Sequence, residues 1–310
     1  CIDSAYKNET AKVAIKGGYF AHFDPANNKA EGAGTNFVAD GYVSVTSDKS
    51  GYDYKVVQKT YTGTIVVKPA VAEPEVKVSG NIAENDKTAV ENAAKTVSAP
   101  TLGAAAADEA QKIDEAKANE LVAKANEVTG NAGDKKLYVQ SALKVEPTAY
   151  DAANKTLTLE ITPQYRVVAS TADKAGDIKL DGNNKNAQVV QDYQPMNITK
   201  ATVVTMELPN GFAAAGNKLS IKHTKGNGSI EYYTGVVSAD GKSVTFTTKG
   251  FSPFTISAPA ASIDETMYPT LAEAIAKAAN GNTVKLEKNC EESVSVSGKS
   301  LTIDKNNYVY

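Results

Sequence analysis

Short runs with a hydrophobic residue at every second position recur between residues 137 and 258, and they constrain the fold more than any other feature of this sequence. A period of two places alternate side chains on opposite faces of a strand, so each run predicts a half-buried β-strand. Turn-forming residues such as Pro209-Asn210-Gly211 and Asp240-Gly241-Lys242 separate the runs, and residues 236–246 predict a hairpin. The expected strands are 137–145, 156–161, 165–169, 203–208, 219–223, 232–237, 243–247 and 254–256. Their number and spacing predict a β-sandwich over residues 136–260.

Residues 1–68 contain similar runs that are broken by glycine. Strands are expected at 13–20, 41–45, 52–57 and 64–67, with Pro69 ending the last one. Four tyrosines recur on these strands: Tyr19, Tyr42, Tyr52 and Tyr54. Packing of aromatic against β-branched residues across strands is the favoured interpretation. The alternative is a carbohydrate-binding surface, because an exposed tyrosine combines an apolar ring with a polar hydroxyl.

Residues 69–135 combine a proline-containing linker with a helical segment. Apolar residues at helical spacing predict one helix over 85–98 and another over 104–128, closed by Gly130 and Gly133. The apolar stripe of the second helix is mostly alanine, so it buries little area per turn. We therefore expect this helix to need a closely packed neighbour.

Residues 261–310 have a different pattern. Thr270, followed three residues later by Glu273, forms a capping box that predicts a short helix over 271–278. Strands of three residues are expected at 284–286, 294–296 and 301–303. Short strands at short spacing after a helix are typical of the start of a parallel β-helix, in which the helix covers the open end.

Three groups of residues also resemble known proteins. The segment 268–286 resembles the first turn of the pectate-lyase-like right-handed β-helices of bacterial surface proteins, and 13–20 with 37–57 is similar to the closing coils of another such helix. Residues 159–170 and Gly250-Phe251-Ser252-Pro253-Phe254 resemble a β-sandwich module of uncharacterised role that occurs beside such helices. The resemblance implies a mainly β, adhesin-like protein with β-helix coils at both ends of a central helical segment and sandwich.

Composition argues against several classes of function. The 310 residues carry 33 Lys+Arg and 36 Asp+Glu, a net charge of −3, so no basic excess favours nucleic acid. The apolar runs are too short to insert in a membrane. Two cysteines, Cys1 and Cys290, cannot make a disulfide framework or a zinc ribbon. A lipid-modified cysteine is usually followed by a polar, flexible tether, but here a strand is expected from residue 13 onward. We therefore expect this sequence to be a piece cut from a longer chain.

Neither histidine, His22 or His223, has a sequence neighbour that suggests a triad, and His223 is expected to be a sheet residue. Cys290, among polar residues, is expected to be a bystander thiol. The single arginine, Arg166, is expected to stack on a tyrosine or bridge a carboxylate. Lyase activity would need clustered calcium ligands and an arginine or lysine on one β-helix face. The expectation is therefore that the chain is not an enzyme.

Calcium is a candidate cofactor. Asp173, Asp177 and Asp181 lie with Asn183, Asn184 and Asn186 in one oxygen-rich segment, but the spacing lacks a twelve-residue loop ending in Glu. A solvated loop is the favoured interpretation. An isopeptide bond between a lysine and an asparagine side chain is a further hypothesis, because both residue types are abundant.

The expected function is that of a non-catalytic structural or adhesive segment of an extracellular bacterial surface protein, acting as a spacer between β-helix rods. The expected domains are 1–68, 69–135, 136–260 and 261–310. The alternative is a carbohydrate-binding module that uses the tyrosine-lined surface. Host or bacterial surface glycans or proteins are the expected partners.

Overall fold

The computed structural model describes residues 12–39, 41–58, 65–125, 135–198 and 200–310. The chain divides into two compact units, which are described separately. The first unit comprises 1–70, 107–140 and 166–193, and the second comprises 71–106, 141–165 and 194–310. The division follows contacts rather than chain order, and the four contiguous domains expected from the sequence stay a prediction.

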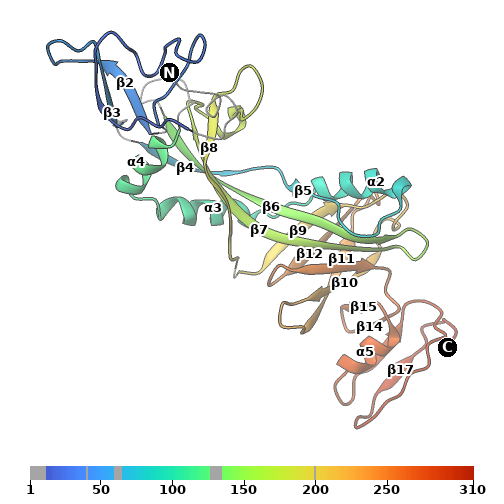
Figure 1. The fold of residues 1–310 in the computed structure, drawn as a ribbon. Coiled ribbons are helices and arrows are strands. Elements are labelled where there is room, and N and C mark those ends of the chain that lie inside the picture. The colour runs from blue at the N-terminus through green and yellow to red at the C-terminus, as the bar shows by residue number, and fades with distance from the viewer. Residues whose placement is uncertain (1–11, 40, 59–64, 126–134, 199) are drawn as a thin grey trace. The chain divides into compact units, whose positions relative to one another are not determined.

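One large sheet contains most of the strands (Figure 1). Its main path has the order β4-β6-β7-β13-β10-β11-β12-β9, while β5 pairs with β6 and β8 pairs with β7. From β7 to β9 every neighbouring pair along this path is antiparallel, whereas β5 runs parallel to β6. The strands are β4 (Val66–Val71), β5 (Glu75–Val76), β6 (Lys136–Asp151), β7 (Thr156–Ser170), β8 (Ala187–Pro195), β9 (Thr202–Glu207), β10 (Lys218–Thr224), β11 (Ile230–Val237), β12 (Ser243–Thr248) and β13 (Pro253–Ser257).

The β-sandwich expectation is wrong in its topology, because the strands join one mainly antiparallel, curled half-barrel sheet instead of two facing sheets. The pattern did identify mainly β structure, and β11 and β12 form the hairpin expected over 236–246. Two expected strands, 156–161 and 165–169, are one continuous strand, β7, which runs through Pro163. The run over 187–195 was missed as a strand and forms β8.

Helix α2 (Glu84–Lys95) supplies part of the core of the second unit. Its apolar residues fall at helical spacing, and Val90, Ala93 and Ala94 are buried. They belong to one hydrophobic cluster with Leu157 and Leu159 of β7. A helix and one curled sheet thus enclose this core, where a sandwich would have used a second sheet.

The helix expected over 104–128 is two helices, α3 (Thr101–Gln111) and α4 (Glu115–Ala123). Asp114 is the reason for the break, because its side chain accepts a hydrogen bond from the Lys117 amide and caps α4. The alanine-rich stripe is buried as expected, including Ala106 in α3 and Ala118 in α4. Gly130 and Gly133 lie outside the described residues.

The amino-terminal strands form a separate three-stranded sheet. Its strands are β1 (Gly18–Phe20), β2 (Tyr42–Thr46) and β3 (Tyr54–Gln58). β3 pairs antiparallel with both β1 and β2. A parallel β-helix requires successive coils to pair in parallel, so the prediction of closing β-helix coils over 1–68 is wrong for these strands.

The carboxyl-terminal strands form a four-stranded sheet in the order β15-β14-β16-β17. It contains β14 (Ala261–Ile263), β15 (Thr266–Tyr268), β16 (Thr283–Leu286) and β17 (Thr302–Asp304), with helix α5 (Leu271–Lys277) between β15 and β16. Thr270 is confirmed as the helix N-cap, because its side chain accepts from the Glu273 amide. β16 and β17 are parallel, but β14 is antiparallel to β15 and β16, and 294–296 forms no strand. The second β-helix prediction is therefore wrong, and no β-helix occurs in the described residues.

Candidate functional site

The small sheet divides the four tyrosines predicted to line a sugar-binding surface. Residues paired across strands share a face, and successive residues alternate between faces. The register pairs Phe20 with Tyr54 and Tyr54 with Thr46, so Tyr42 and Tyr54 share one face. Tyr19 pairs with Lys55 and projects from the other face. The structure therefore does not bring the four rings together.

Tyr19 instead meets Tyr52, which lies in the turn before β3. Their ring centroids are 5.7 Å apart and their planes are inclined by 59°. Tyr19 is 46% exposed and Tyr52 is 37% exposed. Lys49 Nζ lies 4.9 Å from the Tyr19 centroid and 4.8 Å from that of Tyr52, so its ammonium contacts both π-faces. We call Tyr19, Lys49 and Tyr52 the tyrosine patch.

Polar groups border the tyrosine patch. The His22 amide donates to Asp53 Oδ2 at 2.6 Å, and His22 Nδ1 lies 3.0 Å from the same oxygen. Lys55 Nζ lies 2.8 Å from Asp48 Oδ1. This contact lowers the pKa of Asp48 and raises the pKa of Lys55. The two rings thus stand beside charges of both signs, an arrangement that can combine stacking with hydrogen bonding to hydroxyl groups.

The acidic segment proposed for calcium is placed differently. Asp173 Oδ1 lies 2.7 Å from Lys136 Nζ, and this lysine lowers the pKa of Asp173. Asp177 ends the short 3-10 helix η2 (Ala175–Asp177), and its carbonyl accepts from the Asn186 side chain. Over the described residues, no three His, Cys, Asp or Glu side chains gather as a metal site. Calcium binding stays a prediction, in which Asp173 would have to leave Lys136.

Arg166 has the structural role that we expected. Its Nε donates to Gln140 Oε1 at 2.9 Å, and its guanidinium lies 4.8 Å from the centroid of the Tyr193 ring. Tyr193 is in β8, the strand that the sequence pattern missed. Cys290, in contrast, is buried in the apolar cluster of the carboxyl-terminal sheet, although its sequence neighbours are polar.

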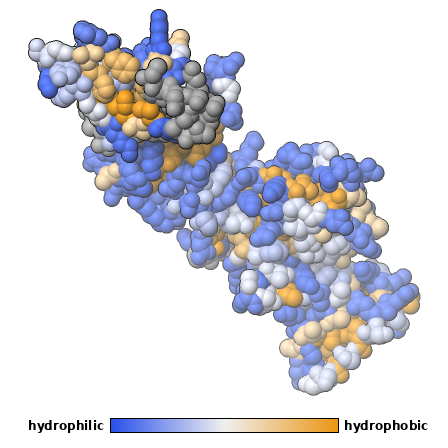
Figure 2. All heavy atoms as spheres, viewed as in Figure 1, coloured by the Kyte–Doolittle hydropathy of each residue, from blue (hydrophilic) through white to orange (hydrophobic). Residues whose placement is uncertain are grey.

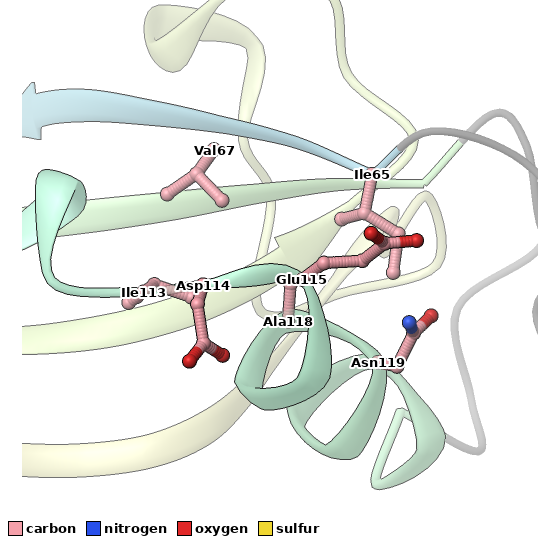
Figure 3. Close-up of a pocket in the computed structure, with 7 residues that line it drawn as sticks. All are labelled: Ile65, Val67, Ile113, Asp114, Glu115, Ala118 and Asn119. Atoms are coloured by element: carbon pink, nitrogen blue, oxygen red, sulfur yellow. The ribbon is translucent and has the colours of Figure 1, made fainter.

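A cavity of about 440 Å³ lies beside α4 in the first unit (Figure 3). Ile65 and Val67 form one wall, and Asp114, Glu115 and Asn119 lie on the other. The Asp114 carboxylate caps α4, and in Figure 3 it points away from Val67. The acidic side chains among the described residues that line this cavity are therefore Asp114, which is engaged as a helix cap, and Glu115.

His223 is a sheet residue, as expected, but it also contacts groups that sequence proximity did not reveal. It lies in β10 and is 1% exposed, and its ring stacks on Phe254 of β13 with centroids 4.6 Å apart. Ser252, which precedes β13, lies within hydrogen-bond distance of this ring. The Gly250–Phe254 segment, which contains Ser252, stands out in the sequence. Its position beside His223 does not, because the pairing of this segment with β10 depends on the strand order of the sheet.

Comparison with family models, curated proteins and solved structures finds no match to this chain. The resemblance to β-helix surface proteins therefore has no support from relatives, and the antiparallel sheets contradict it. No helix in the described ranges is both long and apolar enough to cross a membrane. Hydrophobic side chains on the face in Figure 2 appear as separate patches among hydrophilic ones. What is shown is a mainly β protein with short helices.

Proposed function

We propose that this chain is an adhesive segment of an extracellular bacterial surface protein and that it binds glycans through the tyrosine patch. The observation that carries the proposal is the pair of exposed rings, Tyr19 and Tyr52, with Lys49 against both. Aromatic rings offer apolar area at low entropic cost, while the ammonium can meet a carboxylate or hydroxyl group on a sugar. Binding of this kind breaks no covalent bond.

Composition supports the proposed location, since the chain has few cysteines and is rich in alanine, lysine, threonine, serine and asparagine. The spacer role between β-helix rods is not proposed, because it depended on the β-helix. Surface glycans of a host or of bacteria remain the proposed partners.

A purely structural role is the second candidate, and one observation favours it. The Tyr19 and Tyr52 rings are inclined by 59° rather than coplanar, and Lys49 already occupies their faces. In that case the patch is a cation–π cluster that joins β1 to the turn before β3. A glycan would have to displace Lys49 or pair with it.

A glycan array separates the two candidates. The wild-type chain should bind a defined set of glycans above background, and Tyr19→Ala or Tyr52→Ala should weaken that binding at least about tenfold, because truncation of a central aromatic contact costs more than about 1.4 kcal/mol. The readout is the dissociation constant for the best glycan on the array.

Tyr308→Ala is the matched control, since Tyr308 is 38% exposed and lies in the carboxyl-terminal segment of the second unit. It should bind as the wild type does. If the wild type binds no glycan, or all three variants bind equally, the glycan proposal is wrong and the structural role is favoured.

A further inference from the structure

The second unit contains a serine–histidine pair, with the histidine buried and the serine half-buried, that the proposed function does not use. Ser252 Oγ lies 2.5 Å from His223 Nε2. β10 pairs with β13, and this register sets His223 opposite Phe254, two residues after Ser252. Stacking on Phe254 fixes the plane of the imidazole. A serine and a neutral imidazole in this geometry are a nucleophile and its base.

A carboxylate lies on the other side of the imidazole. Glu231 Oε2, on the neighbouring strand β11, is 3.6 Å from His223 Nδ1, just beyond hydrogen-bond distance. Lys225 and the Tyr233 hydroxyl both hold this carboxylate, and the Lys225 contact is the main reason that the pKa of Glu231 falls to about 2. Glu231 is therefore ionised at neutral pH and can orient His223 and stabilise its protonated form.

An open cavity of about 640 Å³ lies next to this pair. His223 and Ser252 line it together with apolar side chains, among them Met196, Ile198 and Phe251. Lys225 and Lys249 also line it, and Lys225 is already paired with Glu231. The apolar wall fits a short acyl group, and Lys249 can stabilise an oxyanion that forms near Ser252.

We propose that Ser252 is a nucleophile for acyl transfer from esters with short apolar acyl groups, with His223 as its general base and Glu231 as the residue that positions His223. This activity goes beyond glycan binding and depends on a different set of residues.

In the proposed reaction, Ser252 Oγ forms a bond to the ester carbonyl carbon while its proton moves to His223 Nε2. His223 then gives this proton to the leaving alcohol as the ester C–O bond breaks. Water attacks the acyl-serine in the same way, with His223 taking its proton, and this step releases the carboxylic acid and restores Ser252. The positive charge that forms on His223 faces Glu231.

The Thr224 carbonyl competes for the serine proton, since it lies 2.8 Å from Ser252 Oγ. If the hydroxyl donates to Thr224 and accepts from Nε2–H, the group is only a structural link between β10 and the segment before β13. The reactive tautomer requires Ser252 to donate to Nε2. Chemical labelling of the serine distinguishes these two states.

The test uses the full chain and a fluorophosphonate, in which the serine oxygen displaces fluoride from phosphorus. The expected result is a single adduct in the intact mass, located on Ser252 by peptide mapping, together with hydrolysis of p-nitrophenyl butyrate. His223→Gln should slow labelling by about 10²–10⁴-fold. Glu231→Gln should slow it less and should move the acid limb of its pH profile to lower pH, which a merely structural role would not do.

Ser229→Ala is the control variant, because Ser229 lies in the turn between β10 and β11 and contacts Asn227 instead of His223. It should label as the wild type does. Absence of an adduct on Ser252, or an equal rate in His223→Gln, would overturn the proposal.

Discussion

At the scale of the residue, His223 illustrates how burial changes chemistry. Burial lowers the pKa of His223 below its ordinary value of 6.5, and Glu231 only partly opposes this effect. Lys225 lies on the far side of Glu231 and adds to the lowering. The unfolded chain therefore binds the His223 proton more readily than the folded chain does.

The free energy of unfolding should consequently be constant above the unfolded pKa of 6.5 and should fall as the pH drops through the folded pKa of His223. We expect the urea midpoint of the wild type to decrease between pH 7 and pH 5, and that of His223→Gln to decrease less. Glu231 acts in a separate window, from its ordinary value of 4.5 to about 2. Equal pH dependence of the two proteins between pH 7 and pH 5 would contradict this account.

At the scale of the element, Gly80 explains how the segment after β5 stays beside β6. The Ser79 amide donates to the Pro147 carbonyl at 3.0 Å, and Asn81 forms a bridge with Ala149. Gly80 has φ +84°, and a Cβ added there would lie 2.1 Å from the Thr148 carbonyl oxygen. A side chain at this position must therefore push the two backbones apart.

Gly80→Ala should lower the free energy of unfolding by clearly more than the about 1–2 kcal/mol that left-handed backbone costs a residue with a Cβ. Gly211→Ala is the matched control, since Gly211 has φ +70° with nothing within 4 Å of the added Cβ. The free energy of unfolding of Gly211→Ala should fall only by that conformational cost. Urea unfolding monitored by circular dichroism measures both, and equal losses would show that the close approach to Thr148 has no consequence.

At the scale of the molecule, β9 is the edge strand of the large sheet within the second unit. The connection between α2 and α3 pairs with the side of β9 that faces away from β12. Ser98 and Thr205 exchange both backbone hydrogen bonds, at 2.9 and 3.0 Å. This pairing protects an edge that would otherwise expose unpaired amides and carbonyls.

Residues that exchange both bonds have Cα atoms about 5.5 Å apart, within the range that a disulfide spans. The double variant Ser98→Cys/Thr205→Cys should therefore form a cross-link on oxidation, and the closed loop of about 100 residues should raise stability by up to about 5 kcal/mol. Peptide mapping identifies the bond, and a rise in urea midpoint on oxidation measures the gain.

Ser98→Cys/Thr245→Cys is the control, because Thr245 pairs with Thr205 from β12 and lies one strand further away. It should not cross-link within the folded chain. A cross-link in this control, or none in the first variant, would contradict the order of the sheet edge.

Local patterns were sufficient for several elements. The N-cap at Thr270, the helix after it and the hairpin around Asp240 and Gly241 each depend on contacts a few residues apart. A proline misled the prediction at one strand end. Pro69 was expected to end a strand but lies inside β4, which is an edge strand and does not need every amide.

The candidate sites were less predictable than the elements. The sequence shows that tyrosines alternate on strands, but the register decides that Tyr19 is separated from Tyr42 and Tyr54 and meets Tyr52. Ser252 and Glu231 are 29 and 8 residues from His223, and no short motif joins the three.

The amino-acid sequence by itself determined that this protein is mainly β, where most of its strands and helices lie, and which faces are apolar, because periodicity and turn chemistry act over a few residues. Only the tertiary structure decided that the central strands join one curled sheet with α2 against it, that the amino-terminal strands form an antiparallel sheet and the carboxyl-terminal ones a mixed sheet, and that His223 meets Ser252 and Glu231. The physical reason is that a strand exposes the same hydrogen-bonding groups to any partner. Strand order and direction therefore depend on which pairings bury the most apolar surface in the whole chain.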